Sequence, residues 1–551
     1  RNWILIASES KYLSLISGVL NLLVILRIIM HMMAKKKNVK KNSFISYEFN
    51  NPFEFSTELA LERSDISETW PKSIIREINK IKKEEKQDSS ISRVDLTNKS
   101  FVTIDGKSAK DFDDALYAEE TSSGFKLFVS IADVSEYVRK NSSLDIEALN
   151  RGTSIYFRNK VIPMLPELLS NERCSLNPNE KKYTISCVID LTKDAKIKDY
   201  DFCESVITSR ARLTYENLGP LFSKPKNKLD KKIDDSLNNL EKIYLALKDR
   251  RQKRNSIEFN LSETRPITDK SNRILKFSKL SRNEYHGVVE ECMILANICA
   301  ANFLLKRKIP TIFRFHEKPD LSKIRNLKEF LTSRGFKKNM KSSNYRSSIL
   351  SWLEESKKTR FEEIINIQIL RSMKLAKYDS TNSDHFALAL DKYCHFTSPI
   401  RRYADLVVHR GIKGYLRKRN KNDGSSFVYN KNEVAEISEI ISDKERKAEK
   451  ITKEAEKFLK CKCAENYIGE EFEGTIVSVF DFGFFVKIHK LNIDGFCHVN
   501  SFRGGKRIRY KLDEIIQALR GRKENYYVGD SIRVKITSVD IFKKRIDLKK
   551  C

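Results

Sequence analysis

The segment Asp105-Gly-Lys-Ser-Ala-Lys-Asp111-Phe-Asp113-Asp114 places four carboxylates within ten residues of a chain that is otherwise strongly basic. Carboxylates at this density repel one another unless cations lie between them, and such oxygen ligands suit Mg²⁺ or Mn²⁺. Hard cations in a basic protein indicate phosphate chemistry, in which metals activate water and stabilise the leaving oxygen. The alternative is an acidic turn in solvent, since runs of charge are usually surface features.

Strand-like segments on both sides of this acidic segment favour the metal site. Residues 100–104 (SFVTI) precede it, and residues 115–118 (ALYA) and 124–133 (GFKLFVSIAD) follow it, bounded by a turn signal. We therefore expect the carboxylates on a loop between buried strands, where a rigid scaffold fixes them and unpaired charge would be costly.

The four aspartates and several later segments resemble the catalytic domain of the ribonuclease II and ribonuclease R family, the RNB type. Ile131-Ala-Asp-Val-Ser135 follows the aspartates, and the remaining segments occur in the family's order within residues 50 to 550. They are YFRNKVIPMLP at Tyr156–Pro166, CSLN at Cys174–Asn177, VEECM at Val289–Met293 and HFTSPIRRY at His395–Tyr403. The last segment makes the resemblance closer to ribonuclease R than to ribonuclease II.

The resemblance implies a multidomain fold with an α/β catalytic domain and a C-terminal all-β barrel. Alternation in Gly474–Ile488, Gly495–Val499 and Asp530–Ile536 is typical of an OB-fold barrel of the ribosomal type. Family members usually carry cold-shock barrels before the catalytic domain, and here that OB region is truncated or degenerate. The expected parts are residues 1–50, an apolar and basic segment of uncertain role; 51–97, a remnant of the cold-shock region and a linker; 98–415, the RNB-type catalytic domain; 416–467, a helical connector; and 468–551, the barrel.

Three helices are expected from periodicity and charge pattern. Lys226–Arg254 is a charge-rich helical span, and Glu284–Lys306 carries the pattern of a buried helix. Ala435–Cys463 mixes lysine and glutamate at helical spacing, which predicts a solvated helix between two domains.

The activity that the resemblance implies is 3′→5′ hydrolysis of single-stranded RNA, processively, to nucleoside 5′-monophosphates during RNA turnover and processing. Two Mg²⁺ ions about 4 Å apart, with Mn²⁺ as the alternative ion, would clamp the scissile phosphate. Asp105, Asp111, Asp113 and Asp114 would hold the metals, with Asp113 and Asp114 catalytic. Arg401 would face the phosphate in the transition state, where a guanidinium fork matches phosphate oxygens.

The resemblance also implies residues that contact RNA. Tyr156 would lie on the terminal 3′ nucleotide, Phe259 would clamp the bases from the other side, and Glu290 or Glu291 would support the site from a helix. An ordinary contact to the phosphate backbone is expected for Arg402. On the barrel, exposed aromatic rings beside cations bind single strands with little sequence preference. The expected stacking surface consists of Phe482, Phe485 and His498, with Arg545 nearby. For each aromatic residue the alternative is a place in the core.

Composition agrees with a polyanionic partner. The chain has 104 Lys plus Arg against 74 Asp plus Glu, a net charge of +30, and such a surplus favours nucleic acid with binding that weakens in salt. A lysine-rich proteome from an AT-rich genome is the alternative source of the surplus. The ten cysteines lack paired metal spacing, which indicates a reducing cytosol and no zinc site.

The apolar segment Tyr12–Met33, followed by the lysines of residues 35–41, is long enough to span a bilayer. Arg27 within it opposes membrane insertion, so membrane anchor, buried or interfacial helix, and artefact of a mis-set start all stay open. We expect a cytoplasmic monomer, with peripheral or N-terminal membrane association as a further option. Its expected partners are single-stranded RNA, and ribosomes or RNA-decay factors.

Two competing functions stay open. A non-catalytic RNA-binding protein of the same fold would have lost metal carboxylates, yet all four aspartates are present. A DNA-directed or endonucleolytic phosphodiesterase would give internal cuts, whereas a 3′ exonuclease gives mononucleotides and a short residual core.

Overall fold

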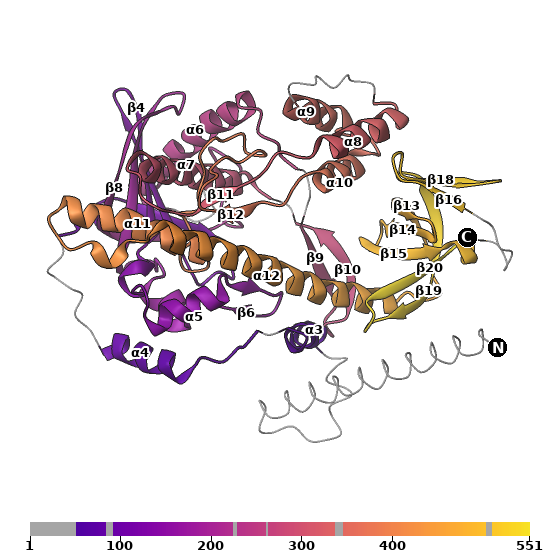
Figure 1. The fold of residues 1–551 in the computed structure, drawn as a ribbon, viewed down its shortest axis with the longest axis horizontal. Helices are drawn as coiled ribbons and strands as arrows, with labels where there is room; N and C mark the ends of the chain where they lie inside the picture. The colour runs from indigo at the N-terminus through magenta and orange to yellow at the C-terminus, as the bar shows by residue number, and fades with distance from the viewer. Residues whose placement is uncertain are drawn as a thin grey trace.

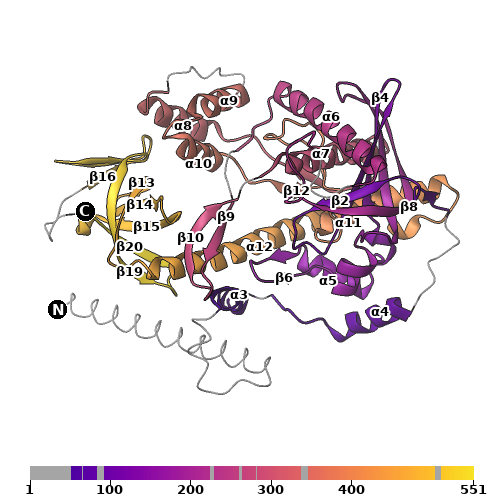
Figure 2. The same cartoon turned by 180° about the vertical axis from the view of Figure 1, so that it is seen from behind.

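The computed structural model describes residues 51–64, 66–83, 92–223, 229–259, 263–280, 282–336, 345–502 and 510–551. An α/β body and a C-terminal barrel lie at opposite ends of the molecule, and the helix α12 (Lys431–Glu465) runs between them (Figure 1). The view from behind shows the same arrangement, with α3 (Pro52–Glu62) beside α12 near the barrel (Figure 2). The segment Tyr12–Met33 lies outside the described residues.

A six-stranded sheet in the order β1-β8-β2-β3-β4-β7 forms the centre of the body. Its strands are β1 (Val94–Asp95), β2 (Phe101–Asp105), β3 (Asp114–Thr121), β4 (Gly124–Ala132), β7 (Lys181–Thr192) and β8 (Ile197–Thr214). The long strand β8 pairs with β7 along its first part and with β2 along its last part, so the sheet curls back on itself. Residues 106–113 join β2 to β3, which confirms that the acidic loop lies between buried strands.

Helices cover both faces of this sheet. The apolar core on one face includes residues of α6 (Lys231–Lys253), α7 (Glu284–Lys306) and α11 (Tyr403–Arg419). The core on the other face includes α5 (Ser143–Arg151) and the first half of α12. The predicted helix Glu284–Lys306 is confirmed to the residue, and the predicted span Lys226–Arg254 is helical from Lys231 onward.

Within the described residues, α7 is the one helix long and apolar enough to cross a membrane, but 78% of its apolar window is buried inside the protein. It is therefore a core helix.

The expected remnant of an N-terminal barrel region is short. Its described residues 51–64, 66–83 and 92–97 contain α3, α4 (Lys72–Lys83) and the two-residue strand β1, which belongs to the central sheet of the body. The α3 helix begins after Asn51, whose side chain accepts a hydrogen bond from the Glu54 amide, and it packs along α12 through Phe55 and Phe458.

The connecting elements of the body are short. They are η2 (Val134–Glu136), β5 (Ile155–Tyr156), β6 (Val161–Ile162), η3 (Leu168–Arg173), β9 (Thr264–Thr268), β10 (Ile274–Lys279), β11 (Phe313–Phe315), α8 (Leu321–Ser333), α9 (Tyr345–Ser356), α10 (Glu362–Ser372), β12 (Lys377–Asp379) and η4 (Ser425–Phe427).

The helix predicted between two domains is present, but it is solvated on only part of its surface. Asn430 and Glu433 form a reciprocal capping box that starts α12, with hydrogen bonds of 2.9 and 2.8 Å. Apolar residues such as Ile441, Ile451 and Phe458 then form a buried stripe along the helix. The lysines and glutamates that dominate its composition occupy the rest of its surface. For this reason the charge pattern alone does not indicate the buried stripe.

The C-terminal module is a closed barrel in the order β13-β14-β15-β20-β19, as predicted. Its strands are β13 (Glu471–Phe480), β14 (Gly483–Ile488), β15 (Ile493–His498), β19 (Ser531–Asp540) and β20 (Arg545–Lys550). The turn η5 (Val499–Ser501) and a separate sheet of β16 (Tyr510–Asp513), β17 (Ala518–Gly521) and β18 (Asn525–Tyr527) complete it.

The structure predicts different effects for Phe482, which lies in the turn before β14, and Phe484, which lies on β14. Phe484 is fully buried and stacks on Phe502, whereas the ring of Phe482 is 50% exposed. We expect Phe484→Ala to destabilise the barrel by about 3–5 kcal/mol through the cavity it leaves, and Phe482→Ala to change stability by less than about 0.5 kcal/mol. Native-state hydrogen exchange of the barrel amides measures both; equal effects would contradict the inward and outward assignment.

Candidate active site

Three separate segments of the chain meet in one open cleft of about 330 Å³. The acidic segment contributes four carboxylates, β5 contributes Tyr156, and the turn before α11 contributes Ser398 and Arg401. The residues that line the cleft are Asp105, Ala109, Asp111, Asp113, Asp114, Tyr156, Ser398 and Arg401. The structure thus brings together all four predicted metal ligands, the predicted catalytic arginine and the predicted tyrosine.

Hydrogen bonds from distant segments fix the acidic loop. Ser175, in the CSLN segment, accepts from the Phe112 amide at 3.0 Å and donates to the Lys110 carbonyl at 2.8 Å. The Ile400 amide donates to Asp113 Oδ1 at 2.9 Å, which ties the loop to the turn before α11. The carboxylates are therefore held before any ligand arrives.

Arg401 faces the acidic loop from this turn. Its Nη2 donates to Ser398 Oγ at 2.9 Å, and its Nε lies 3.7 Å from Asp113 Oδ2. The side chain is 42% exposed, so part of the guanidinium is open to the cleft. Its carbonyl accepts from the Ser154 amide and the Thr153 hydroxyl, both at 3.0 Å, next to β5.

Tyr156 stands at the rim of the cleft. Its hydroxyl donates to Asp111 Oδ2 at 2.7 Å, and the residue is 44% exposed. A ring that is partly exposed and hydrogen-bonded to a cleft carboxylate is available to a ligand, so it is not a core residue.

Burial and mutual repulsion raise the pKa values of the cleft carboxyls. Burial, followed by the charge of Asp111, raises the pKa of Asp105 to about 6. Burial and then Asp105 raise the pKa of Asp114 to about 8, and burial raises the pKa of Asp113 well above its usual value although Arg401 opposes this. Hard cations would relieve this repulsion, and an all-carboxylate donor set is one that Mg²⁺ or Mn²⁺ accepts. The residues present therefore fit a metal site.

Arg402 has a different place from its neighbour. Its Nε and Nη2 both donate to Asp405 at 2.8 Å, and its side chain is mostly buried. Because Asp405 occupies this guanidinium fork, the geometry favours a structural role for Arg402 over a contact with the RNA backbone.

The predicted supporting glutamates bind an arginine. Arg251 Nη1 donates to Glu290 at 2.9 Å and to Glu291 at 2.7 Å. Phe259 lines a different cavity, of about 1130 Å³, together with Arg251 and His286. These residues lie outside the lining of the acidic cleft.

The predicted stacking residues form an exposed aromatic surface on the barrel. Phe482 and Phe485 are 50% and 37% exposed, and His498 is exposed as well, so none of the three is a core residue. Phe480 stacks on Phe482 at 5.6 Å, and Phe496 lies 5.0 Å from Phe485. Sequence reasoning missed these last two rings, although period-two alternation along β13 and β15 puts them on the same face. Arg545 is exposed and pairs with Asp547 at 3.0 Å.

Tyr215 is a further residue beside the cleft that the sequence did not indicate. Its amide donates to the Asp105 carbonyl at 3.2 Å, and its ring stacks on His286 at 3.7 Å. Burial, and then Asp114 and Asp105, raise the pKa of its hydroxyl. Only the parallel pairing of β2 with β8 brings it there, and that register cannot be read from local sequence.

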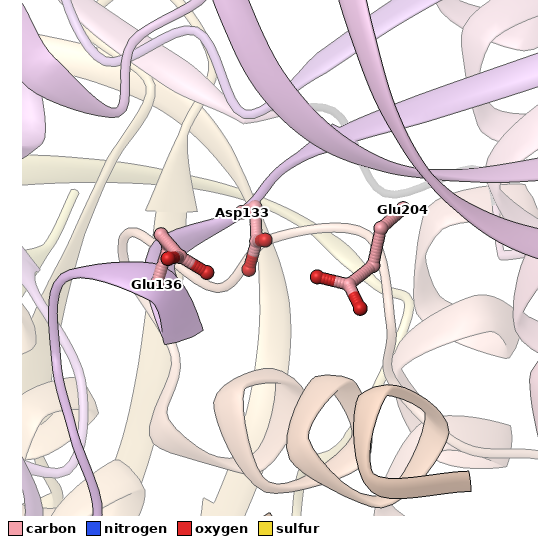
Figure 3. Close-up of side chains that lie close together, drawn as sticks. All are labelled: Asp133, Glu136 and Glu204. Atoms are coloured by element: carbon pink, nitrogen blue, oxygen red, sulfur yellow. The ribbon is translucent and has the colours of Figure 1, made fainter. Parts of the chain in front are cut away.

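Asp133, Glu136 and Glu204 form a second acidic cluster (Figure 3). Among the described residues it is the one group of three acidic, histidine or cysteine residues whose ligand atoms lie within 4.8 Å of one another, close enough to hold a metal ion. The ammonium of Lys413, however, lies 2.6 Å from both Asp133 and Glu136 and 3.7 Å from Glu204. Burial raises the pKa of Asp133, but Lys413 outweighs it and lowers that pKa to about 2. The cluster is therefore a buried ion-pair network.

This network predicts a large effect on stability from one lysine. Lys413 is fully buried, so Lys413→Ala leaves a buried carboxylate without its cation and should cost about 3–5 kcal/mol of unfolding free energy. Lys357→Ala removes an exposed pair with Glu354 and should cost less than about 0.5 kcal/mol. Urea denaturation compares the two; unchanged stability in Lys413→Ala would contradict the network.

The acidic cleft predicts stabilisation by metal that depends on pH. Protons compete with a cation for Asp105 and Asp114, whose pKa values are about 6 and about 8. Mg²⁺ at 100 times its Kd should stabilise the protein by about 2.7 kcal/mol, and a fixed Mg²⁺ concentration should raise Tm more at pH 8.5 than at pH 6. Thermal melts with Mg²⁺ and with EDTA test this, with Asp113→Asn/Asp114→Asn as the variant that should not respond. An equal rise in that variant would contradict metal binding in the cleft.

Known proteins match this chain over most of its length. A family model for the RNB domain matches residues 93–418, and one for the S1 RNA binding domain matches residues 466–550. Ribonuclease R of Escherichia coli (strain K12) is 37% identical over 502 residues, which are 89% of this chain and 61% of that protein. Ribonuclease R of Buchnera aphidicola subsp. Schizaphis graminum is 38% identical over 499 residues, 89% of this chain and 68% of that protein. The chain spans about 60% of the length of the larger relatives.

A solved structure gives the same result. Mycoplasma genitalium RNase R in complex with ribose methylated single-stranded RNA matches with a TM-score of 0.84 at 30% identity, over 91% of this chain and 78% of that chain. The RNB match over more than half of the chain, together with these relatives, shows that the chain belongs to the RNB family of ribonuclease R and its homologues.

Proposed function

We propose that this chain is a 3′→5′ exoribonuclease that shortens single-stranded RNA processively and releases nucleoside 5′-monophosphates. The observation that carries the proposal is the single cleft in which four aspartates, Arg401 and Tyr156 meet. Membership of the RNB family and the S1-type barrel support it. The Mycoplasma relative, whose structure holds single-stranded RNA, supports RNA as the substrate.

Metal-dependent chemistry suits the acidic cleft, since nucleases of the RNB family are metal-dependent in general. Asp105, Asp111, Asp113 and Asp114 would hold Mg²⁺, with Mn²⁺ as the alternative. Bound there, the metal would supply a water nucleophile at neutral pH and neutralise charge on the departing oxygen.

Arg401 stabilises the phosphate in this proposal. Ser398 holds one arm of its guanidinium, and the hydrogen bonds to its carbonyl from Thr153 and Ser154 hold its backbone. The cation is therefore preorganised where charge develops on the phosphate oxygens, and such donors act mainly on the transition state.

Tyr156 positions the 3′ end. It also lines a neighbouring cavity of about 930 Å³ that reaches Lys487, Asn492 and Asp494 of the barrel. Because the two cavities share Tyr156, a strand bound on the barrel aromatics has a path to the acidic cleft. Basic and acidic side chains both line this path, so the barrel and the cleft would supply most of the affinity.

A single assay tests the proposal. Purified chain with a 5′-labelled single-stranded RNA and Mg²⁺ should give progressive 3′ shortening to a short core. Asp113→Asn should lower the rate about 1,000-fold or more with RNA binding retained, and Arg401→Lys should lower kcat about 100- to 1,000-fold. Asp190→Asn, which removes a half-buried carboxylate on β7 outside the lining of the cleft, should change the rate little.

Three outcomes would contradict the proposal. Equal rates in the Asp113 variant and the unchanged protein would show that the reaction does not take place in this cleft. Internal ladders would indicate an endonuclease, and binding without shortening would indicate an RNA-binding protein with a silent site.

A further inference from the structure

Another cavity, of about 680 Å³, lies where α3, α5, the β5–β6 hairpin and α12 meet. It lies behind the acidic cleft. Ile155 lines this cavity and the next residue, Tyr156, lines the cleft, and successive side chains of a strand point to opposite faces. Nothing in the proposed reaction uses this cavity.

Cations dominate its wall. Four segments contribute six basic residues against two acidic ones, which are Arg63, Arg151, Lys444, Lys447, Lys450 and Lys544 against Glu147 and Glu454. Both acidic residues already have cations: Glu147 binds Arg151 at 2.8 Å, and Glu454 binds Lys544. The wall therefore carries a surplus of positive charge.

Three lysines on one helix make up most of this surplus. Lys444, Lys447 and Lys450 all belong to α12. None of them forms an ion pair with another residue that the structure describes, and Asp65 is not among those residues. Lys447 and Lys450 are exposed and Lys444 is half-buried, with its stem against Gly152. Their ammonium groups are thus available to an anion that enters the cavity.

Neighbouring cations add to the effect of burial on Lys544. Burial, and then Arg63 and Lys450, lower the pKa of Lys544 to about 8 even though Lys544 contacts Glu454. Cations gathered in a concave site create a potential that attracts anions. A bound anion would remove the repulsion between them.

Apolar side chains complete the cavity. Leu59 and Ile66 line it from the N-terminal side, Ile155 and Ile162 from the hairpin, and Ile451 from α12. A cavity of this size with an apolar wall and a few charged groups fits a ligand with both a flat apolar part and an anionic part. A nucleotide has both parts, whereas an inorganic anion would leave the apolar wall unused.

We propose that this cavity binds a nucleotide, with its phosphate on Lys447 and Lys450 and its base against the apolar wall. The nucleotide is either a free nucleoside 5′-monophosphate or one residue of an RNA strand. The choice of nucleotide rests on the proposed function, whereas the affinity of these lysines for phosphate does not.

A ligand in this cavity would lie against residues that position the proposed catalytic residue Arg401. Thr153 lines the cavity and donates to the Arg401 carbonyl at 3.0 Å. The ligand would thus contact the segment that holds Arg401 and Tyr156 from behind.

The experiment measures binding of adenosine 5′-monophosphate to the full chain by calorimetry, with EDTA present so that no metal-dependent binding in the cleft contributes. Lys447→Gln/Lys450→Gln should weaken binding about tenfold. Lys418→Gln/Lys431→Gln is the matched control: it removes the same charge at exposed positions outside this cavity and should bind as the unchanged protein does. Adenosine, which lacks the phosphate, should bind more weakly than the monophosphate to the unchanged protein and show no loss in the first variant.

A second arm distinguishes the two sources of phosphate. With a ten-nucleotide single-stranded RNA, the same pair of variants gives the slope of log K against log salt, whose magnitude falls by about 0.7 for each phosphate that the protein ceases to neutralise. A shallower slope in Lys447→Gln/Lys450→Gln without monophosphate binding supports an RNA strand. Monophosphate binding that is abolished in this variant supports the free nucleotide.

Equal monophosphate affinity and equal salt slopes in all three proteins would overturn the site. Because no metal or turnover is involved, this result is independent of whether the chain proves to be an exoribonuclease.

Discussion

The hydrogen bond from the Ile400 amide to Asp113 joins the two parts of the chain on which the cleft depends. It links the loop between β2 and β3 to the turn that begins α11, almost 290 residues later in the sequence. A buried carboxylate is stable only where donors or cations compensate it. Here one oxygen has the backbone donor, and the other faces Arg401. Asp113 thus fixes the acidic loop through one oxygen and faces the guanidinium of Arg401 through the other.

Buried ion pairs along α11 hold the turn from its other side. Asp405 accepts from the Ser398 amide at 2.7 Å and binds the fork of Arg402. Further along the helix, Arg410 binds Asp145 and Lys413 binds Asp133, both at distances below 3 Å. The Asp405 contacts stay within the turn and the start of α11, Arg410 ties the helix to α5, and Lys413 ties it to Asp133 directly after β4. Removing any one cation leaves an uncompensated charge in the interior, which explains why a helix remote from solvent carries so many polar residues.

The parts of the fold that the sequence predicted are those with local signals. Turn residues bound the acidic loop, a 3.6-residue period marks α7, and alternation marks the barrel strands. The cleft residues followed from motifs, because Asp105, Tyr156 and Arg401 each lie in a long segment with a specific residue order. What could not be predicted depends on partners distant in sequence. The hydrogen bond from the Ile400 amide to Asp113 is the first example, because it joins residues 287 positions apart.

Other differences have the same origin. Arg251 on α6 takes up Glu290 and Glu291 of α7, and Tyr215 reaches the cleft through the pairing of β8 with β2. The charge-rich pattern of α12 concealed the apolar stripe that α3 and the barrel cover. Long-range pairing decides the first two cases and leaves no periodic pattern in the sequence, whereas the stripe of α12 is periodic but outnumbered by charged residues.

The end of α12 has a consequence for how the molecule is divided. Phe458, Leu459 and Cys463 of this helix belong to the same apolar core as Phe472 and Val534 of the barrel, and that core also includes Phe55 of α3 and Trp352 of α9. A cut at residue 466, where the S1 match begins, would expose this shared surface on both fragments. The start of the S1 match therefore does not coincide with an edge of the hydrophobic core, which extends across it.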